Sequence, residues 1–417
     1  MNFLFKYKKI FLGLAILIAA AIFGYLIYFL FFYEEPPRQP REERPATTTR
    51  GELPEAGEGE PGQVEEPGEG IPPGEERPSE EEPGPEVDEE ARGGVTETTA
   101  LNDEPSMGAT LSEDGKGVQY YNQEDGKFYK IDENGNVATM TDKVFHDVDE
   151  VTWSPTKNKA VLEYPDGSNI VYNFDQEKQV TLPKHWEDFD FSPNGNQIVS
   201  KSIGLDEENR WLITSDADGG NVRAVEEIGN NADSVYPNWS PNHQMIAMHT
   251  EGVDFDTQKV FFTGKNNENF ENIKVEGRNF QPKWSEKGDK LLYSVYSSRN
   301  DMKPQLWSVN ANPGEVGTKR QTIGVNTWAE KCTFANNHEA YCGVPKDLPE
   351  GAGMFEELGQ NTSDQIYKID IEKGDKQLMA TPDKDINVSE IQVSEDGSTL
   401  FFTDSENKNV HKMKLGK

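Results

Sequence analysis

Short apolar runs alternate with polar turns from about residue 105 to the end of the chain. The runs are three to five residues long and are rich in β-branched and aromatic side chains, which is typical of β-strands and too short for helices. The turns between them are rich in Asn, Asp and Gly, which suit tight turns. Such runs lie at residues 161–164, 170–172, 245–248 and 291–294. The pattern predicts an all-β domain.

A tripeptide of the form Trp-Ser-Pro recurs through this domain. It is complete at Trp153 and Trp239, and altered copies begin at Leu111, Phe191, Trp284, Phe334 and Val393. The seven copies are 38 to 59 residues apart, and such a period indicates a repeat architecture. Each repeat holds about four short strands, as in one blade of a β-propeller. We expect seven blades; six or eight remain open, because the copies at Leu111 and Val393 are degenerate.

The seventh repeat has room for only three strands before the chain ends. Residues 95–101, a Thr- and Val-rich stretch at the start of the domain, are the candidate for its missing fourth strand. Pairing the two ends of the chain in one blade would close the ring and remove an exposed sheet edge. We therefore assign residues 95–417 to the propeller.

The order of features within a repeat resembles a known family. An aromatic-Ser-Pro tripeptide is followed by a turn such as Asn194-Gly195, an apolar run, an Ile-Tyr-like run and a hairpin such as Asp218-Gly219-Gly220. This order resembles the TolB-type, WD-like propeller repeat and is similar to the propellers of prolyl oligopeptidases and dipeptidyl peptidases. The resemblance covers about residues 105–417 and implies the fold. The periplasmic family member carries an α/β domain before its propeller, which residues 1–94 do not resemble, so no Tol-system role is implied.

The first 33 residues have the features of a membrane anchor. The 24 residues from Ile10 to Tyr33 carry no charge, and a helix of that length rises about 36 Å, enough to cross a bilayer core of about 30 Å. Lys6, Lys8 and Lys9 precede the segment, so the positive-inside rule places the N-terminus in the cytoplasm and the rest of the chain outside. A cleaved signal peptide ending near Ala21 is the alternative. The 12 apolar residues after Ala21 favour an uncleaved single-pass anchor.

Residues 34–94 form a stalk of Pro, Glu and Gly. They contain too few apolar residues to offset the cost of ordering the chain, and we expect them to be disordered. Residues 34–104 hold 23 acids and 6 bases, about half of the formal net charge of −34. So acidic a chain would be repelled by phosphates, and we expect no nucleic-acid partner.

The chain shows no recognisable catalytic or cofactor motif. It has no Gly-x-Ser-x-Gly elbow, no Walker or Rossmann glycine pattern, and six His residues without zinc-helix spacing. Acidic turns at residues 132–136 and 216–221 lack the glycine and the closing Glu of a calcium loop. We expect no cofactor and no metal.

Two cysteines flank a single predicted turn. If residues 334 and 340 border the hairpin, Cys332 and Cys342 face each other across adjacent strands, and an exported domain permits a bridge. A disulfide and two free thiols both remain open, because cross-strand geometry is demanding.

The loops between the second and third strands lengthen in successive repeats. They lie at residues 204–209, 251–258, 297–304 and 343–364, and should emerge on one face together with the connections between blades. Loops on a rigid scaffold commonly carry binding, although they can also simply cap the core. The candidate binding residues are Phe255, Tyr296, Met302, Met354, Phe355 and Leu358, with Trp186 and Trp328 in the connections.

The sequence therefore predicts a membrane-anchored, extracytoplasmic and non-catalytic propeller. Its expected partners are the bilayer through Ile10 to Tyr33, and a protein or an envelope polymer at the loops. The alternative is a propeller enzyme, carbohydrate-active or lactonase-like, with acids in the central channel. Asp149, Asp188 and Asp233 are the candidates for these acids, because they precede the innermost strands.

Overall fold

The computed structural model describes residues 86–266, 268 and 270–416. The predicted anchor from Ile10 to Tyr33 and most of the predicted stalk lie outside these residues. Within them, no helix is both long enough and apolar enough to cross a bilayer. The regular structure of the described chain is almost entirely β-strand, and its five helices are short 3₁₀ helices of three to six residues.

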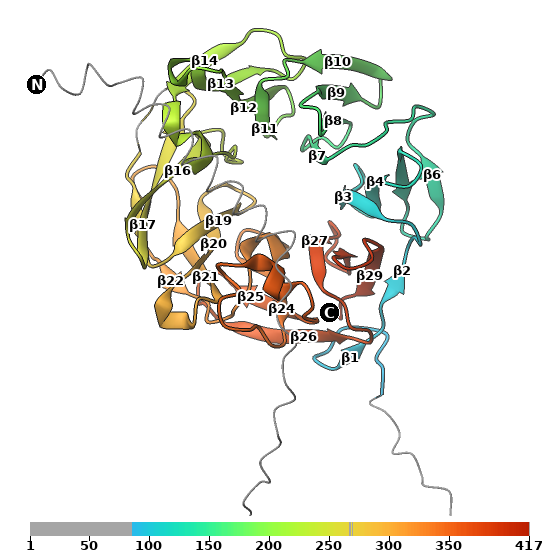
Figure 1. Cartoon of the computed structure of the whole chain (residues 1–417). Coiled ribbons are helices and arrows are strands. Elements are labelled where there is room, and N and C mark those ends of the chain that lie inside the picture. The colour runs from blue at the N-terminus through green and yellow to red at the C-terminus, as the bar shows by residue number, and fades with distance from the viewer. Residues whose placement is uncertain (1–85, 267, 269, 417) are drawn as a thin grey trace, which may run out of the picture. The chain divides into compact units, whose positions relative to one another are not determined.

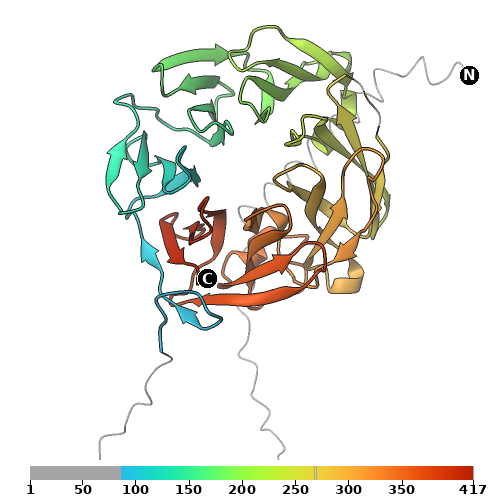
Figure 2. The same cartoon turned by 180° about the vertical axis from the view of Figure 1, so that it is seen from behind.

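Seven β-sheets stand radially around a central axis, so the fold is a seven-bladed β-propeller (Figure 1). The same ring is seen from behind in Figure 2. Blades 1 to 5 each take four consecutive strands, which run antiparallel in chain order from the axis outward. The predicted all-β fold and the blade number of seven are confirmed.

The first five blades follow one another in chain order. Blade 1 has β3 (Ser106–Leu111), β4 (Val118–Asn122), β5 (Lys127–Ile131) and β6 (Val137–Thr139), and blade 2 has β7 (Glu150–Trp153), β8 (Lys159–Glu163), β9 (Asn169–Asn173) and β10 (Lys178–Leu182). Blade 3 has β11 (Trp186–Phe191), β12 (Gln197–Ile203), β13 (Arg210–Asp216) and β14 (Arg223–Glu227). Blade 4 has β15 (Val235–Pro237), β16 (Met245–Asp254), β17 (Thr257–Gly264) and β18 (Ile273–Val275), and blade 5 has β19 (Arg278–Trp284), β20 (Lys290–Tyr296), β21 (Pro304–Asn310) and β22 (Gln321–Thr322).

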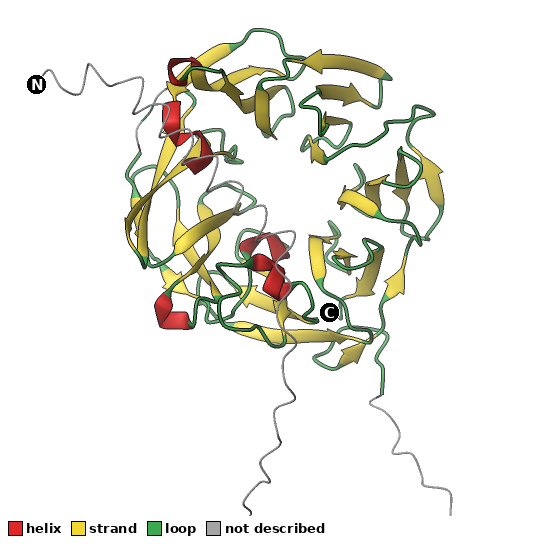
Figure 3. Cartoon of the chain, in the orientation of Figure 1, coloured by secondary structure: helices red, strands yellow, loops and turns green. Residues whose placement is uncertain are grey.

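The last two blades share the N-terminal strands. Blade 6 has β23 (Cys332–Phe334), β24 (Glu339–Pro345), β25 (Asp364–Asp370) and β26 (Lys376–Pro382), and blade 7 has β27 (Val388–Val393), β28 (Thr399–Asp404) and β29 (Val410–Lys414). The 3₁₀ helices, red in Figure 3, are η1 (Glu207–Asn209), η2 (Gly229–Ser234), η3 (Ser298–Asn300), η4 (Ala329–Lys331) and η5 (Glu356–Gly359).

The N-terminal part of the domain closes the ring, as the sequence predicts. β2 (Thr99–Ala100) pairs antiparallel with β29 and is the fourth strand of blade 7. β1 (Val95–Thr96) instead pairs parallel with β26, as a fifth strand of blade 6. The predicted strand over residues 95–101 is therefore two strands on two neighbouring blades.

The folded unit begins earlier than the boundary at residue 95. Ala91 is buried, its N–H donates to Lys414 O at 3.0 Å, and it forms a bridge with Leu415. Asp88 likewise bridges to Thr96. The predicted end of the stalk at residue 94 is therefore wrong. The last residues of the predicted stalk form backbone hydrogen bonds with blade 7, and these bonds hold the segment despite its acidic composition.

The aromatic residue of the repeated tripeptide packs between neighbouring blades. Trp153 of blade 2 stacks on Phe174 at 5.2 Å and meets Phe128 of blade 1 edge-on at 5.4 Å. Trp239 packs in the same way among residues of blades 3 and 4. The core is thus a ring of interfaces between sheets, each built from apolar side chains that alternate along the strands.

The serine of the tripeptide is buried and holds the turn that follows it. The hydroxyl of Ser240 accepts the N–H of Met245 at 2.9 Å and donates to Asn242 Oδ1 at 2.7 Å. The same acceptor bond, from the residue five positions on, is made by the serines Ser112, Ser192, Ser285 and Ser394. The serine is a structural residue.

Candidate functional site

The loops between the second and third strands of blades 3 to 6 are the candidate binding face. In blade 4 the predicted loop at residues 251–258 is instead an extension of the hairpin, because β16 runs to Asp254, β17 starts at Thr257, and only Phe255 and Asp256 turn. In blade 6 the segment between β24 and β25 remains a long insertion, residues 346–363. The helical part of this insertion is the single 3₁₀ turn η5.

Hydrogen bonds join three of these loops to one another. Asp256 of blade 4 accepts the N–H of Ser298 in blade 5 at 2.7 Å and also contacts its hydroxyl. From the insertion of blade 6, Gly351 N donates to Asp301 O at 2.9 Å and Gly353 N donates to Met302 O at 2.7 Å. The three loops therefore form one connected surface across blades 4, 5 and 6.

Two glycines let the insertion lie close against the blades. A Cβ at Gly353 would come within 2.5 Å of Tyr296 Cβ, and one at Gly359 within 2.5 Å of the Trp328 ring. Since such distances are far below van der Waals contact, glycine is required at both positions.

A buried ion pair fixes the end of the insertion. Lys331 Nζ donates to Asp364 Oδ2 at 2.8 Å and to Asn387 Oδ1 at 2.6 Å, and all three residues are almost fully buried. The Asn387 amide in turn donates to Gly359 O at 2.8 Å, and Asp364 Oδ2 accepts the N–H of Val388 at 2.7 Å. This network ties the insertion to blade 7, so both of its halves are held by neighbouring blades.

Six of the eight predicted binding residues keep some exposure on this face. Phe255 is 63% exposed, Phe355 53%, Leu358 43% and Met354 37%. Tyr296 and Met302 are partly buried where the insertion packs over them.

The two predicted tryptophans are not available to a partner. Trp186 and Trp328 are each 4% exposed. Trp186 packs between blades 2 and 3, and Trp328 lies under the insertion with Leu348 and Ala352. The prediction that they line the binding face is wrong, because Trp186 fills the gap between two sheets and the insertion of blade 6 covers Trp328.

Three further exposed apolar residues on this face were not among the predicted binding residues. Leu205 is 100% exposed at the start of the blade 3 loop, Val253 is 47% exposed at the end of β16, and Tyr236 is 40% exposed on β15. The alternation of side chains along a strand would have predicted an exposed Val253, had residues 251–254 been assigned to the hairpin. No comparable sequence pattern predicts the exposure of Tyr236.

A groove of about 520 Å³ lies between these elements. Tyr236, Tyr296 and Met354 contribute apolar walls, and Glu356 and Glu357 contribute carboxylates. Asn279 and Gln281 donate their side-chain amides to Glu356 Oε1 at 2.8 and 2.7 Å, which holds that carboxylate in place. The groove can accept an elongated side chain with a polar end.

The acids predicted for the central channel do not converge. Asp149 and Asp233 are exposed, and Asp188 forms an ion pair with Lys201. Within the described part of the chain, no three His, Cys, Asp or Glu residues are grouped so as to hold a metal ion.

A different acidic group lies near Asp188, at the inner strands of blades 2 and 3. Burial, followed by repulsion from Glu150 and Asp188, raises the pKa of Glu163 to about 8. Burial also raises the pKa of Glu150. In blade 3, burial raises the pKa of Asp190 to about 7, although its carboxylate accepts the N–H of Phe191 at 2.8 Å. None of these three acids was among the acids predicted for the channel, because the surroundings of a side chain at a blade interface leave no mark on the local sequence. Glu163 and Asp190 are partly buried, and Glu150 keeps an exposed surface.

The acidic turns that resemble calcium loops satisfy their own carboxylates. Asp132 accepts the N–H groups of Asn134 and Asn136 at 2.9 and 2.8 Å. The hydrogen bond from the side-chain amide of Asn136, together with these backbone bonds, lowers the pKa of Asp132. Asp216 accepts the Asn221 amide at 2.6 Å. Both segments act as turns between the third and fourth strands of a blade.

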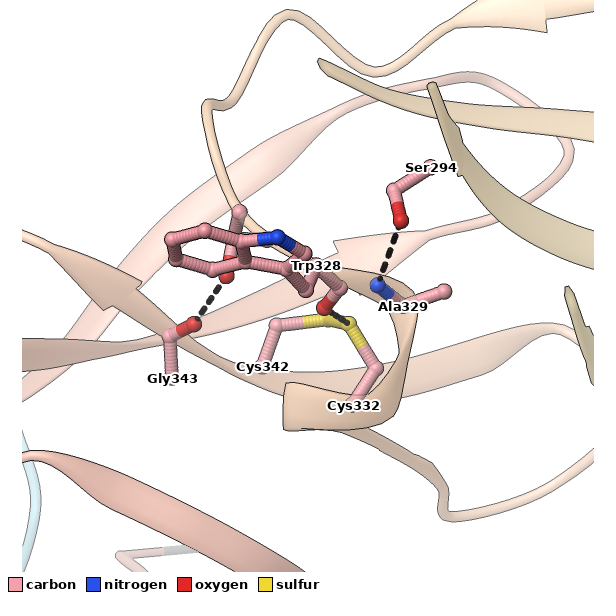
Figure 4. The surroundings of a disulfide bond; sticks show 7 residues. Ser294, Trp328, Ala329, Cys332, Cys342 and Gly343 are labelled. Atoms are coloured by element: carbon pink, nitrogen blue, oxygen red, sulfur yellow. Dashed lines mark hydrogen bonds between the residues drawn. A yellow bond between two sulfur atoms is a disulfide. The ribbon is translucent and has the colours of Figure 1, made fainter. Parts of the chain in front are cut away.

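Cys332 and Cys342 form a disulfide across β23 and β24, with an S–S distance of 2.11 Å (Figure 4). The two residues are paired directly opposite each other in the register of the strands. Figure 4 also shows Ala329 N donating to Ser294 Oγ at 3.1 Å, which links this corner to blade 5. The bridge is buried beside Trp328, beneath the insertion of blade 6, and so supports the scaffold that carries this loop.

Comparison with known proteins supports the fold alone. No family model matches the chain, and no curated protein sequence matches it. Among solved structures, an oligogalacturonate lyase in complex with manganese aligns with a TM-score of 0.50 at 12% identity, over 77% of this chain and 93% of the lyase. The oligogalacturonate lyase from Vibrio parahaemolyticus aligns with a TM-score of 0.50 at 10% identity, over 77% of this chain and 94% of its own.

A third similar structure is not described as an enzyme. The β-propeller domain of Cps50 (Swd1) from Myceliophteria thermophila aligns with a TM-score of 0.53 at 10% identity, over 76% of this chain and 98% of that domain. At these identities the likeness extends to architecture and not to activity. The chain is a β-propeller.

Proposed function

We propose that this chain is a membrane-anchored, extracytoplasmic propeller of TolB-like type that binds a protein or envelope partner without catalysis. The observation that carries the proposal is the connected loop surface of blades 4 to 6. It presents Phe255, Phe355 and Leu358 to solvent on loops that are held by hydrogen bonds and a buried ion pair. Exposed apolar side chains on rigid loops are typical of interaction sites.

The binding face can be tested by site-specific photo-crosslinking in cells. A photoreactive residue replaces Phe355 on the loop face, and Val222 serves as the control. Val222 is 54% exposed and lies in the turn between β13 and β14, at the opposite ends of the strands. We expect a discrete crosslinked product from position 355 and none from position 222. Equal products from both positions would contradict a specific binding face.

The anchor and topology rest on the apolar segment from Ile10 to Tyr33 and on the lysines before it. The test introduces a cysteine at Asn2 or at Ser79 and treats intact cells with a membrane-impermeant thiol reagent. We expect labelling of Ser79→Cys and not of Asn2→Cys, with the protein recovered in the membrane fraction. Labelling of Asn2→Cys, or recovery in the soluble fraction, would contradict the proposed topology.

A propeller hydrolase or lyase is the second candidate, and the acidic group around Glu163 is the observation that favours it. A carboxyl with a pKa of about 8 can act as a general acid at neutral pH. The test incubates the protein with oligogalacturonate and other acidic oligosaccharides. Turnover that is lost in Glu163→Gln would support an enzyme, and the absence of turnover would leave the binding function.

A further inference from the structure

The exposed apolar residues of the loop face are surrounded by carboxylates. Phe255 lies between Asp254 and Asp256, and Phe355 precedes Glu356 and Glu357. Leu205, in blade 3, precedes Asp206, Glu207 and Glu208. The four loops, residues 204–209, 251–258, 297–303 and 346–363, together hold 11 acids and 3 bases. The face is therefore both apolar and strongly negative.

The groove beside these loops is mainly polar. Tyr236, Tyr296 and Met354 supply its smaller apolar part, and the carboxylates of Glu356 and Glu357 lie at the same site. Arg278 also borders the groove, but its guanidinium donates to the carbonyl oxygens of Asp254, at 3.1 Å, and Thr257, at 3.5 Å. A lysine or arginine side chain would place its stem along the aromatic and methionine walls and its cation near Glu357.

We propose that the loop face binds a cationic, amphipathic polypeptide segment, whose apolar side chains contact Phe255, Phe355 and Leu358 and whose lysines or arginines contact the surrounding carboxylates. This inference rests on the proposed binding function and narrows it. Charge complementarity decides between the two partner classes: a polyanionic envelope polymer would bring like charges together, whereas a cationic protein would be attracted and oriented.

The test measures binding of the full-length protein to fluorescent peptides of about 14 residues. One peptide combines Lys and Leu on opposite helical faces, the second carries Glu in place of Lys, and the third carries Ser in place of Leu. Polyglycerol phosphate, a polyanion, is the non-protein probe. We expect the Lys/Leu peptide to bind more tightly than every other probe, with an affinity that falls as salt is added.

Matched variants separate a local site from the general acidity of the domain. The pair Glu350→Gln/Glu357→Gln removes two charges from the loop face, and Glu133→Gln/Glu177→Gln removes two exposed charges from the opposite end of the blades. We expect the first pair to weaken the binding of the Lys/Leu peptide about tenfold, and the second pair to weaken it less than about twofold. Phe355→Ser should also weaken it about tenfold, the size typical of an anchor residue.

Each outcome has a defined meaning. Equal losses in the two charge pairs, or preferential binding of the Glu peptide or of polyglycerol phosphate, would overturn the cationic partner. If one of those other probes still depended on Phe355, the binding face itself would stand. If no probe bound, and photo-crosslinking at position 355 also gave no product, both the inference and the proposed function would fail.

Discussion

At the scale of single residues, the repeated serine shows how position decides the role of a reactive side chain. Its hydroxyl is saturated by the backbone N–H five residues later and by a polar side chain two to four residues later in the turn. It is also 0–5% exposed in six blades. In blade 6 the same position is Ala335, and in blade 2 the hydroxyl of Ser154 contacts only Thr156, so the propeller tolerates blades without the backbone bond.

Removing one of these hydroxyls should cost stability and not binding. Ser240→Ala leaves the N–H of Met245 without its acceptor, and a buried unsatisfied donor costs about 1–3 kcal/mol. We expect a lower midpoint of denaturant unfolding with unchanged partner crosslinking. The control Ser79→Ala, in the predicted stalk, should leave the midpoint unchanged. Lost crosslinking at full stability would contradict a structural role.

The partly buried acid Glu163 should make stability depend on pH. Its folded pKa of about 8 lies above the ordinary value of 4.5, so the folded state holds the proton more tightly than the unfolded state. The contribution of this group to stability is therefore present at low pH and is lost as pH rises from about 4.5 through 8. Asp190, with a pKa raised to about 7, acts in the same direction.

Glu163→Gln keeps the shape and the acceptor oxygen but cannot ionise. We expect the variant to lose less stability than the original protein between about pH 5 and pH 8.5, measured by thermal unfolding at both values. Glu177→Gln, at an exposed turn, should show the same change of stability with pH as the original protein. Parallel curves for all three proteins would show that Glu163 does not titrate in this range.

At the scale of elements, the sequence predicts the strands well and the side chains of the connections poorly. Strand positions follow from alternation and from turn residues, which are local signals. Exposure in a connection depends on the gap between two sheets, which is not local. Trp186 fills such a gap and Trp328 is covered by the insertion of blade 6, whereas Phe255 turns outward because β16 and β17 pair beyond the edge of the blade.

The disulfide adds a covalent link within blade 6. Cys332→Ala/Cys342→Ala removes a crosslink that closes a loop of about ten residues, and should lower the free energy of unfolding by about 2–4 kcal/mol. The measurement is denaturant unfolding of the double variant and of the original protein with and without reductant. Reduced original protein should unfold near the midpoint of the variant. An unchanged midpoint in both cases would mean that the bridge contributes nothing.

At the scale of the whole molecule, the ring depends on a segment that comes before the first blade. Leu101 N donates to Val410 O at 2.7 Å, next to the β2 and β29 pairing. On the other side, the Glu390 carboxylate of blade 7 accepts the N–H groups of Gly108 and Ala109 in blade 1 at 2.7 and 3.1 Å. The closure in blade 7 was predictable because its repeat lacked a strand. The parallel addition of β1 to blade 6 was not, because nothing in a two-residue strand specifies its partner.

Breaking this closure should weaken the entire domain. Leu101→Pro removes the N–H that bonds to Val410, while Leu101→Val keeps the donor and serves as the control. We expect the proline to lower the free energy of unfolding by about 1–3 kcal/mol and to speed proteolysis. It should also cause some self-association through the uncovered edge of β29. Size-exclusion chromatography and limited proteolysis check the result. Equal behaviour of the two variants would show that the closure does not depend on this bond.

The way the N-terminal segment is attached has a mechanical consequence. Asp88, Ala91 and Gly93 bond to backbone of β1, β29 and β26, so the chain enters the propeller across the junction between blades 6 and 7. A force applied through the preceding residues would strain several hydrogen bonds on two sheets together instead of peeling one strand from one edge. Resistance to such a force is set by the rate of unfolding rather than by equilibrium stability. The segment that closes the ring is therefore also the joint that would transmit tension to a domain held by its N-terminal end.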